Sequence, residues 1–393
     1  MLNTRSAFWG FSLNRQTCEL AMKALQKHLC LLILSFLLTP SQAAEPAIRQ
    51  DYITGALSSF PFDRHQFAEV AQPLSLSAAG VLTTNQQTIV DLARKAFNDD
   101  SFALGIMLLE RGQILFEQFK KGTDHKTKFF SYSMAKSLTA MTVGQALCAG
   151  QIRSLDDRAG AYAKTIEQTV FGQATLRQLL TMSSGARASD EDGGSLFGEW
   201  NDITTGRITI HDLLKKYGSE KVNPHIFSYN NSDTNALMLA VNGTGNFAQL
   251  FEQKIWQPSQ PEQSATWLTD KQGQLYASAG FGAALRDWAR LAMRSVALLK
   301  GADGPCMAEF MQQATTRQTS DTVKQRFWDY GYQTWVTKKW GVPAYAWQGA
   351  YGQSVIVDPT HERVLIIFRY AAQEESYRAV GSLFSRWARM PAQ

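Results

Sequence analysis

The sequence predicts an α/β protein, an α+β sandwich in which an antiparallel sheet is flanked by an N-terminal and a C-terminal helix. Strand patterns separated by turn residues occur before residue 120 and return after residue 333. Between them the chain shows helical periodicity with long loops, so we expect a mostly helical domain inserted between two sheet-forming halves. The predicted divisions are a leader at 1–44, the two parts of the α/β domain at 45–150 and 261–393, and the helical domain at 151–260.

The leader has the organisation of a secretory signal sequence. Lys23 and Lys27 precede the apolar run Leu29–Leu38, and Pro40 and small residues follow, up to Ala44. The apolar run is about half as long as a membrane-spanning helix needs, so a cleaved leader is favoured over a stable membrane anchor. Met22 is a plausible true start. We therefore expect an exported protein that is periplasmic or secreted after cleavage.

The first sheet-forming half begins with an amphipathic helix over Asn85–Phe97, where apolar residues recur at helical spacing. Phe102–Leu109 and Gln113–Phe119 then have the composition of strands. Because only Glu110-Arg111-Gly112 separates them, these two strands are expected to form a hairpin.

The later elements follow from the same periodicities. Expected helices are Leu176–Met182, Ile210–Tyr217, Asp233–Val241, Phe247–Trp256 and the closing Glu374–Met390. Expected strands are Gln333–Thr337, Ala344–Gln348, Ser354–Val357 and Arg363–Phe368. Ser183–Thr205 is rich in Gly, Ser, Asp and Glu, and such a long loop either borders an active site or is a simple surface excursion.

Composition excludes several classes of partner. The formal net charge is +5, and it falls to +2 without residues 1–44, which carry four basic side chains and one acidic side chain. No basic field for nucleic acid remains. The six histidines are scattered and no Cys/His cluster has zinc spacing, so neither a metal nor an organic cofactor is expected.

Two cysteines, Cys148 and Cys306, remain after removal of the leader. An oxidising compartment would permit a disulfide between them. Cys148 lies in an apolar helix, however, and two buried free thiols fit the sequence at least as well.

The first candidate for chemistry is Ser133 with Lys136. From Met134 to Ala149 only Lys136 carries a charge, which predicts a buried helix that ends at Gly150. A serine and a lysine three residues apart share one helix face, and a desolvated amine has a lowered pKa and can take a serine proton. The alternative is a lysine that extends to solvent, one turn from a capping serine.

Two further stretches are candidates for binding. Tyr229 and Asn231 stand in a turn before a helix, where a phenol could relay protons and an amide could contact substrate. Taken alone, this pattern is more simply explained by helix capping. The second stretch, Trp347-Gln348-Gly349-Ala350, precedes a strand, and a backbone N–H there could face the N–H of Ser133 to form an oxyanion hole. Glycine-rich hairpin turns are common, so this stretch is also weak evidence alone.

In this chain order the three stretches resemble the serine β-lactamase and penicillin-binding protein superfamily. The closest group is that of class C β-lactamase-like esterases, peptidases and 6-aminohexanoate-dimer hydrolases. Further matching stretches are Ser154–Asp157, Thr175–Gly185, Ala279–Arg290 and Tyr330–Tyr332. The resemblance extends from about Phe102 to Tyr370.

The resemblance implies an α/β sandwich with an inserted helical domain and a role for each candidate residue. Ser133 would be the acylated nucleophile, Lys136 its base and Tyr229 a proton relay. Asn231 would orient substrate, and the backbone N–H groups of Ser133 and Ala350 would form the oxyanion hole.

One position departs from the family pattern. Where β-lactamases have Lys-Thr-Gly, this chain has Trp347-Gln348-Gly349. The loss of a cation removes a charge-assisted contact with a substrate carboxylate, which argues against efficient β-lactam hydrolysis. At Trp347 the sequence instead favours a neutral or aromatic-contacting substrate group.

The function predicted is an exported serine hydrolase that acts through an acyl-enzyme on a small-molecule ester, amide or peptide. One alternative is a β-lactamase or D-alanyl peptidase that acts on cell-wall-like compounds. Another is a binding protein that holds peptidoglycan fragments without turnover. The presence of Ser133, Lys136 and Tyr229 together argues against the binding protein.

Overall fold

The computed structural model describes residues 64–120, 122–186, 199, 202–203, 206–220, 226–319, 329–337, 339–369 and 373–391. The chain divides into two units, Met1–Ala47 and Ile48–Gln393, and the first lies wholly outside the described residues. The predicted leader at 1–44 and most of the predicted Ser183–Thr205 loop lie outside the described residues.

A seven-stranded sheet forms the centre of the α/β part. Its strand order is β3-β2-β11-β10-β9-β8-β7, and neighbouring strands pair antiparallel. The strands are β2 (Ala103–Glu110), β3 (Gln113–Phe119), β7 (Asp329–Tyr330), β8 (Trp335–Thr337), β9 (Ala344–Gly349), β10 (Gln353–Asp358) and β11 (Arg363–Arg369). The predicted antiparallel sheet and the predicted β2–β3 hairpin are confirmed.

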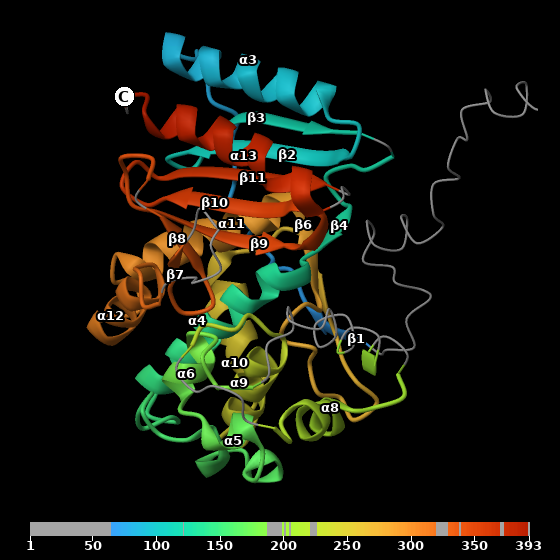
Figure 1. Cartoon of the computed structure of the whole chain (residues 1–393). Coiled ribbons are helices and arrows are strands. Elements are labelled where there is room, and N and C mark those ends of the chain that lie inside the picture. Colours follow the sequence, from blue (N-terminus) through green and yellow to red (C-terminus); the bar gives the residue numbers. More distant parts are fainter. Residues whose placement is uncertain are drawn as a thin grey trace, which may run out of the picture. The chain divides into compact units, whose positions relative to one another are not determined.

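Helices cover both faces of this sheet, which explains why its central strands are almost continuously apolar. Figure 1 shows α3 (Thr84–Asp99) and α13 (Gln373–Ala388) on one face, as the sequence predicts. Within β2, Ile106 and Leu108 point into the core beneath these helices. Met107 and Leu109 point into the core on the other face. Since side chains alternate along a strand, both sets must be hydrophobic.

The second core joins the sheet to the helical region. It contains side chains of α4 (Ala135–Cys148) and α11 (Leu285–Leu299) together with helices of the region between residues 151 and 260. Those helices are α5 (Val170–Gln173), α6 (Leu176–Leu180), α8 (Ile210–Tyr217), α9 (Ser232–Asn242) and α10 (Phe247–Phe251). The predicted Phe247–Trp256 helix changes to a π-helix over Glu252–Trp256. α11 and α12 (Pro305–Ala314) were not among the predicted elements.

A second, four-stranded sheet has the order β1-β5-β6-β4 and was also not predicted as a separate sheet. Its strands are β1 (Arg64–Phe67), β4 (Lys128–Phe130), β5 (Ala265–Leu268) and β6 (Phe281–Ala284). None of them exceeds four residues, which is too short for an alternating pattern to be distinctive. β4 leads directly into the turn that carries Ser133, so this small sheet anchors the start of α4.

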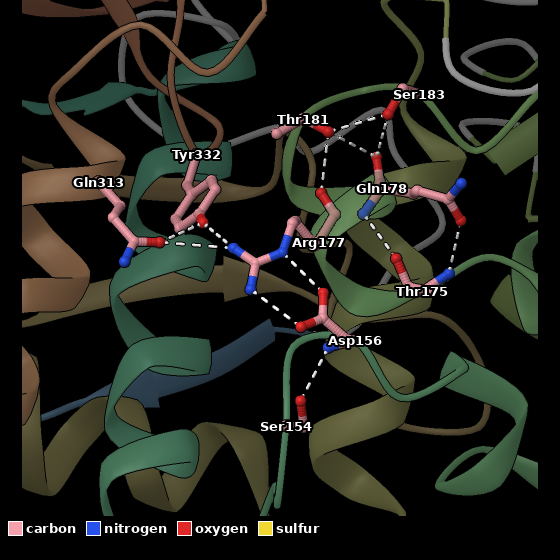
Figure 2. A network of polar contacts seen from close by, with 9 residues as sticks. All are labelled: Ser154, Asp156, Thr175, Arg177, Gln178, Thr181, Ser183, Gln313 and Tyr332. Atoms are coloured by element: carbon pink, nitrogen blue, oxygen red, sulfur yellow. Dashed lines mark hydrogen bonds and ion pairs between the residues drawn. The ribbon is translucent and has the colours of Figure 1, made fainter.

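Three stretches that carry the family resemblance meet in one polar network, shown in Figure 2. Arg177 of α6 donates from Nε to Asp156 Oδ1 at 2.8 Å and from Nη1 to the Tyr332 hydroxyl at 2.5 Å. That hydroxyl donates to Gln313 Oε1 of α12 at 2.5 Å. Gly331 lies so close to the carbonyl oxygen of Ala314 that a Cβ there would be 2.0 Å from it. The network therefore ties the helical region to the segment that enters β8.

The two cysteines outside the leader form a disulfide. Cys148 ends α4 and Cys306 lies in the first turn of α12, with their Cα atoms 5.7 Å apart. The bond closes a span of 158 residues, and cross-links across long spans restrict the unfolded chain most strongly.

Replacing both cysteines, as Cys148→Ser with Cys306→Ser, should lower the free energy of unfolding by about 2–5 kcal/mol, because the unfolded chain regains that freedom. Chemical denaturation of the mature protein measures this difference. As a control, a reductant should destabilise the wild type and leave the double variant unchanged. Equal denaturation midpoints for the two proteins would contradict a stabilising cross-link.

Candidate active site

The turn between β4 and α4 presents Ser133 and is firmly held. Ser131 donates its backbone N–H to the Phe281 carbonyl at 2.7 Å and its hydroxyl to the Ala279 carbonyl at 3.0 Å. Tyr132 has φ +44°, a left-handed conformation that is costly for a residue with a side chain. After this sharp turn Ser133 is partly exposed, whereas Lys136 is 1% exposed. The hydroxyl can therefore be reached from outside and the amine cannot.

The Lys136 amine has three polar partners. Nζ lies 3.0 Å from Ser133 Oγ, 2.8 Å from Asn231 Oδ1 and 3.1 Å from the carbonyl oxygen of Ser278. The oxygens of Asn231 and Ser278 can only accept hydrogen bonds, whereas the serine hydroxyl can also donate. A neutral amine has two N–H groups and one lone pair. The arrangement fits an ammonium that donates to all three oxygens, and it equally fits a neutral amine that donates to the two carbonyl oxygens and accepts the proton of Ser133.

Burial favours that neutral form. Desolvation lowers the pKa of Lys136 to about 7, and the charge of Glu199 acts in the opposite direction. A substantial fraction of the amine is then unprotonated near neutral pH, which a solvent-exposed lysine never reaches. This pKa is what a general base that works near pH 7 requires.

Tyr229 lies beside the same amine. Nζ of Lys136 is 5.0 Å from the centroid of the phenol ring. Trp335 stacks on Tyr229, with the two ring centroids 5.5 Å and the planes 28° apart. The ring is therefore held by packing next to Lys136, and Tyr229 itself is only partly buried.

Asn231 is directed at the site instead of acting as a helix cap. It occupies the N-cap position of α9, yet its side chain makes no capping bond. The neighbouring Asn230 accepts the N–H of Asp233 at 2.7 Å and does the capping. This leaves the buried Asn231 side chain free to hold Lys136, so the capping alternative applies to Asn230 only.

The end of β9 lies directly against the turn that carries Ser133. A Cβ built on Gly349 would be 2.3 Å from the carbonyl oxygen of Ser131, so only glycine permits this approach. Tyr351 then takes φ +63°, and its ring lies edge-on to Tyr132 at 5.1 Å between centroids. Ala350, between these two residues, follows the strand end beside the Ser133 turn.

Trp347 is not brought to the site. Its indole is 2% exposed and packs near Trp288 of α11, with ring centroids 6.4 Å apart. The expectation of a substrate contact by this side chain is therefore corrected, because the indole fills the core. Position 347 also directs no cation toward Ser133.

Two contributors were missed by the sequence reasoning. The Ser278 carbonyl precedes the Ala279–Arg290 stretch that carries part of the resemblance, but a backbone oxygen leaves no mark in a sequence. Glu199 is a buried carboxylate that accepts hydrogen bonds at the start of α9. The only signal for it was its place in the acidic Ser183–Thr205 loop.

A family model described as Beta-lactamase matches residues 95–381, which is more than half of the chain. The chain belongs to the beta-lactamase family. This confirms the resemblance and the α/β fold with antiparallel sheets. No curated protein sequence matches the chain.

Solved structures of this family share its fold. A putative 6-aminohexanoate-dimer hydrolase from Bacillus anthracis is 22% identical, with a TM-score of 0.71, and the match covers 89% of this chain and 96% of that one. A penicillin binding protein from Bacillus halodurans has 17% identity, a TM-score of 0.61 and coverage of 74% and 99%. A D-stereospecific amidohydrolase from Streptomyces sp. has 16% identity, a TM-score of 0.57 and coverage of 76% and 97%. At these identities the likeness concerns the fold.

Gly349→Ala should reduce the reactivity of Ser133 roughly 10²-fold, because the new methyl group must push β9 away from the turn that carries Ser133. The rate of Ser133 labelling by a fluorophosphonate probe measures this, and the melting temperature reports separately on folding. Gly80→Ala is the matched control, since a Cβ at Gly80 meets nothing within 4 Å. Undiminished labelling in a folded Gly349→Ala protein would show that the close approach is not needed.

Proposed function

We propose that this beta-lactamase family member is an exported serine hydrolase that cleaves an ester or a linear amide or peptide bond through an acyl-enzyme on Ser133. The observation that carries the proposal is the 3.0 Å contact between Lys136 Nζ and Ser133 Oγ, made by an amine whose other two partners only accept hydrogen bonds. A buried base is thereby aimed at an accessible hydroxyl.

In the proposed acylation, Ser133 Oγ attacks the substrate carbonyl carbon while its proton passes to Lys136 Nζ. The backbone N–H groups of Ser133 and Ala350 stabilise the oxyanion, a role supported by the close contact of Gly349 with the Ser133 turn. Collapse of the tetrahedral intermediate expels an alcohol or amine, which takes up a proton relayed from Lys136 through Tyr229. Water, deprotonated by the same pair, then attacks the ester carbonyl and releases Ser133.

The proposed substrate class follows from the absence of a lysine at position 347. β-Lactamases use a lysine there for the substrate carboxylate, and here the position holds a core indole. We therefore favour a substrate that is neutral at that point over a β-lactam. The similar structures include an amidohydrolase and a putative 6-aminohexanoate-dimer hydrolase, whose names agree with amide cleavage, and also a penicillin binding protein, so these names do not rank the substrate classes.

Hydrolysis of a p-nitrophenyl ester should depend on Ser133, so that Ser133→Ala loses both turnover and labelling by an acylating probe. Lys136→Met should retain the fold and lose the reaction, because no buried base remains. Rates for the ester, a linear amide and a cephalosporin then rank the substrate classes. A preference for the cephalosporin would overturn the argument from position 347, and absence of Ser133-dependent turnover would favour the binding protein.

Export is the second part of the proposal. The signal pattern at 1–44 supports it, as does the disulfide between Cys148 and Cys306, since such bonds persist in oxidising compartments. No helix among the described ranges combines the length and the apolar character that crossing a bilayer requires.

Expression of the full chain in a bacterial host should yield a periplasmic or secreted product that begins near Glu45. N-terminal sequencing of the fractionated protein measures this, with a Lys23→Glu, Lys27→Glu variant as the control that should delay export. An uncleaved product that stays in the cytoplasm would contradict the proposal.

A further inference from the structure

Glu199 is a buried carboxyl group without a role in the reaction described above. It is 1% exposed. Its Oε2 accepts the backbone N–H of Asn231 at 3.1 Å, and its Oε1 accepts the hydroxyl of Ser232 at 2.8 Å. Burying a carboxyl group is costly, and these two bonds at the start of a helix compensate for only part of that cost.

A chain of contacts connects this carboxyl group to the nucleophile. Glu199 holds the backbone of Asn231, the Asn231 side chain accepts the Lys136 amine at 2.8 Å, and that amine contacts Ser133 Oγ at 3.0 Å. The Asn231 side chain makes no capping bond that would hold the residue in place. The bond from its backbone N–H to Glu199 therefore helps to hold Asn231 where its side-chain amide meets the Lys136 amine.

We propose that Glu199 is a positioning residue for Lys136, which orients the amine through Asn231 and sets, by its negative charge, the pH at which that amine becomes a base. This inference rests on the proposed function of Lys136.

The electrostatic part has a definite sign. Burial raises the pKa of Glu199 to about 7, and burial lowers the pKa of Lys136 to about 7. Each charge opposes the effect of burial on the other group. As the pH rises and Glu199 ionises, its charge favours the protonated amine, so the neutral base forms at a higher pH than it would without Glu199. Removing the charge should therefore move the acid limb of the activity profile to lower pH.

Other ionisable groups also face this pair. Burial raises the pKa of Tyr217 and Tyr276, which interact with Glu199 and stay neutral near pH 7. Burial raises the pKa of Asp233 to about 7 as well, and Glu199 adds to that shift. On the Lys136 side the phenol of Tyr229 faces the amine. Of these groups, Asp233 has a pKa in the same range as Glu199 and Lys136, so the pH profiles need an Asp233 variant as a control.

The test compares pH profiles of kcat/KM for a p-nitrophenyl ester, together with direct NMR titration of Lys136 in protein labelled at lysine Cε. In Glu199→Gln, the midpoint of the acid limb of kcat/KM and the midpoint of the Lys136 titration should each fall by roughly one pH unit. The glutamine keeps a carbonyl oxygen for the Asn231 N–H, and its NH₂ group can donate to the Ser232 hydroxyl. Glu199→Asp keeps the charge, but its shorter side chain moves the carboxylate away from the Asn231 N–H and the Ser232 hydroxyl. This variant should therefore have a lower kcat, while its Lys136 midpoint stays closer to that of the wild type.

Asp233→Asn is the matched control, because it removes a second buried carboxyl group whose charge has no contact with Lys136. Because the charges of Asp233 and Glu199 oppose each other's ionisation, the Lys136 midpoint in Asp233→Asn should stay level or rise slightly, and a fall equal to that in Glu199→Gln would overturn the assignment to Glu199. If Glu199→Gln fails to fold, Ser232→Ala decides the question. This variant leaves Glu199 in place but removes the Ser232 hydrogen bond that stabilises the ionised carboxylate. Glu199 then carries less negative charge at a given pH, so the Lys136 midpoint should again fall, by less than in Glu199→Gln.

The two proposals fail in different ways. Unchanged Lys136 midpoints in Glu199→Gln, in an enzyme with Ser133-dependent turnover, overturn the role of Glu199 and leave the proposed function standing. A wild type without such turnover overturns the proposed function, and the NMR midpoints then still show whether Glu199 controls the Lys136 amine.

Discussion

The structure around Ser133 depends on keeping one amine away from water. Lys136 is basic enough to be protonated wherever solvent reaches it, so its use as a base requires walls on every side. The surrounding helix α4 is accordingly buried around its whole circumference. Asn231 comes from the helical region, and Ser278 from the segment before β6. Segments from separate parts of the chain thus meet at this amine, because no single element could enclose it.

The same requirement explains why the polar partners are so few. A buried amine without partners would destabilise the folded state, and a fully ion-paired amine would keep its proton. Two carbonyl oxygens and a hydroxyl lie between these extremes. They satisfy the N–H groups without providing a full negative charge. Glu199 supplies its charge from farther away, through the backbone of Asn231.

Local signals in the sequence predicted those parts of the fold that are determined locally. α8 begins and ends where expected, because Thr209 forms a capping box with Asp212 and Gly218 follows the last turn. β3 likewise matches its predicted bounds, since it belongs to a tight hairpin. β4 and β6 were missed because each has only three or four residues and they pair across more than 150 positions, for example Lys128 with Ala284. The π-helical turn at Glu252–Trp256 has no distinct periodicity that a short segment could reveal.

In the candidate site, too, the local contacts could be predicted and the contacts between distant segments could not. Ser133 and Lys136 are three residues apart, so their contact follows from helix geometry, and chain order with the family resemblance pointed to Tyr229 and Asn231. The Ser278 carbonyl reaches the amine, and Glu199 reaches the backbone of Asn231, only through tertiary packing. The residue type at position 347 could not show which way its side chain points, and the indole turned out to face the core.

The contact between Gly349 and the Ser131 carbonyl limits how this enzyme could acquire new specificity. The close approach is between main-chain groups, so no side chain can be introduced at position 349 without moving the backbone. Variation is left to partly exposed residues around Ser133, such as Tyr229, and to Gln348 and Tyr351 near the contact. One part of the candidate site is thus fixed by the backbone, while divergence toward other substrates has to come from the residues that surround it.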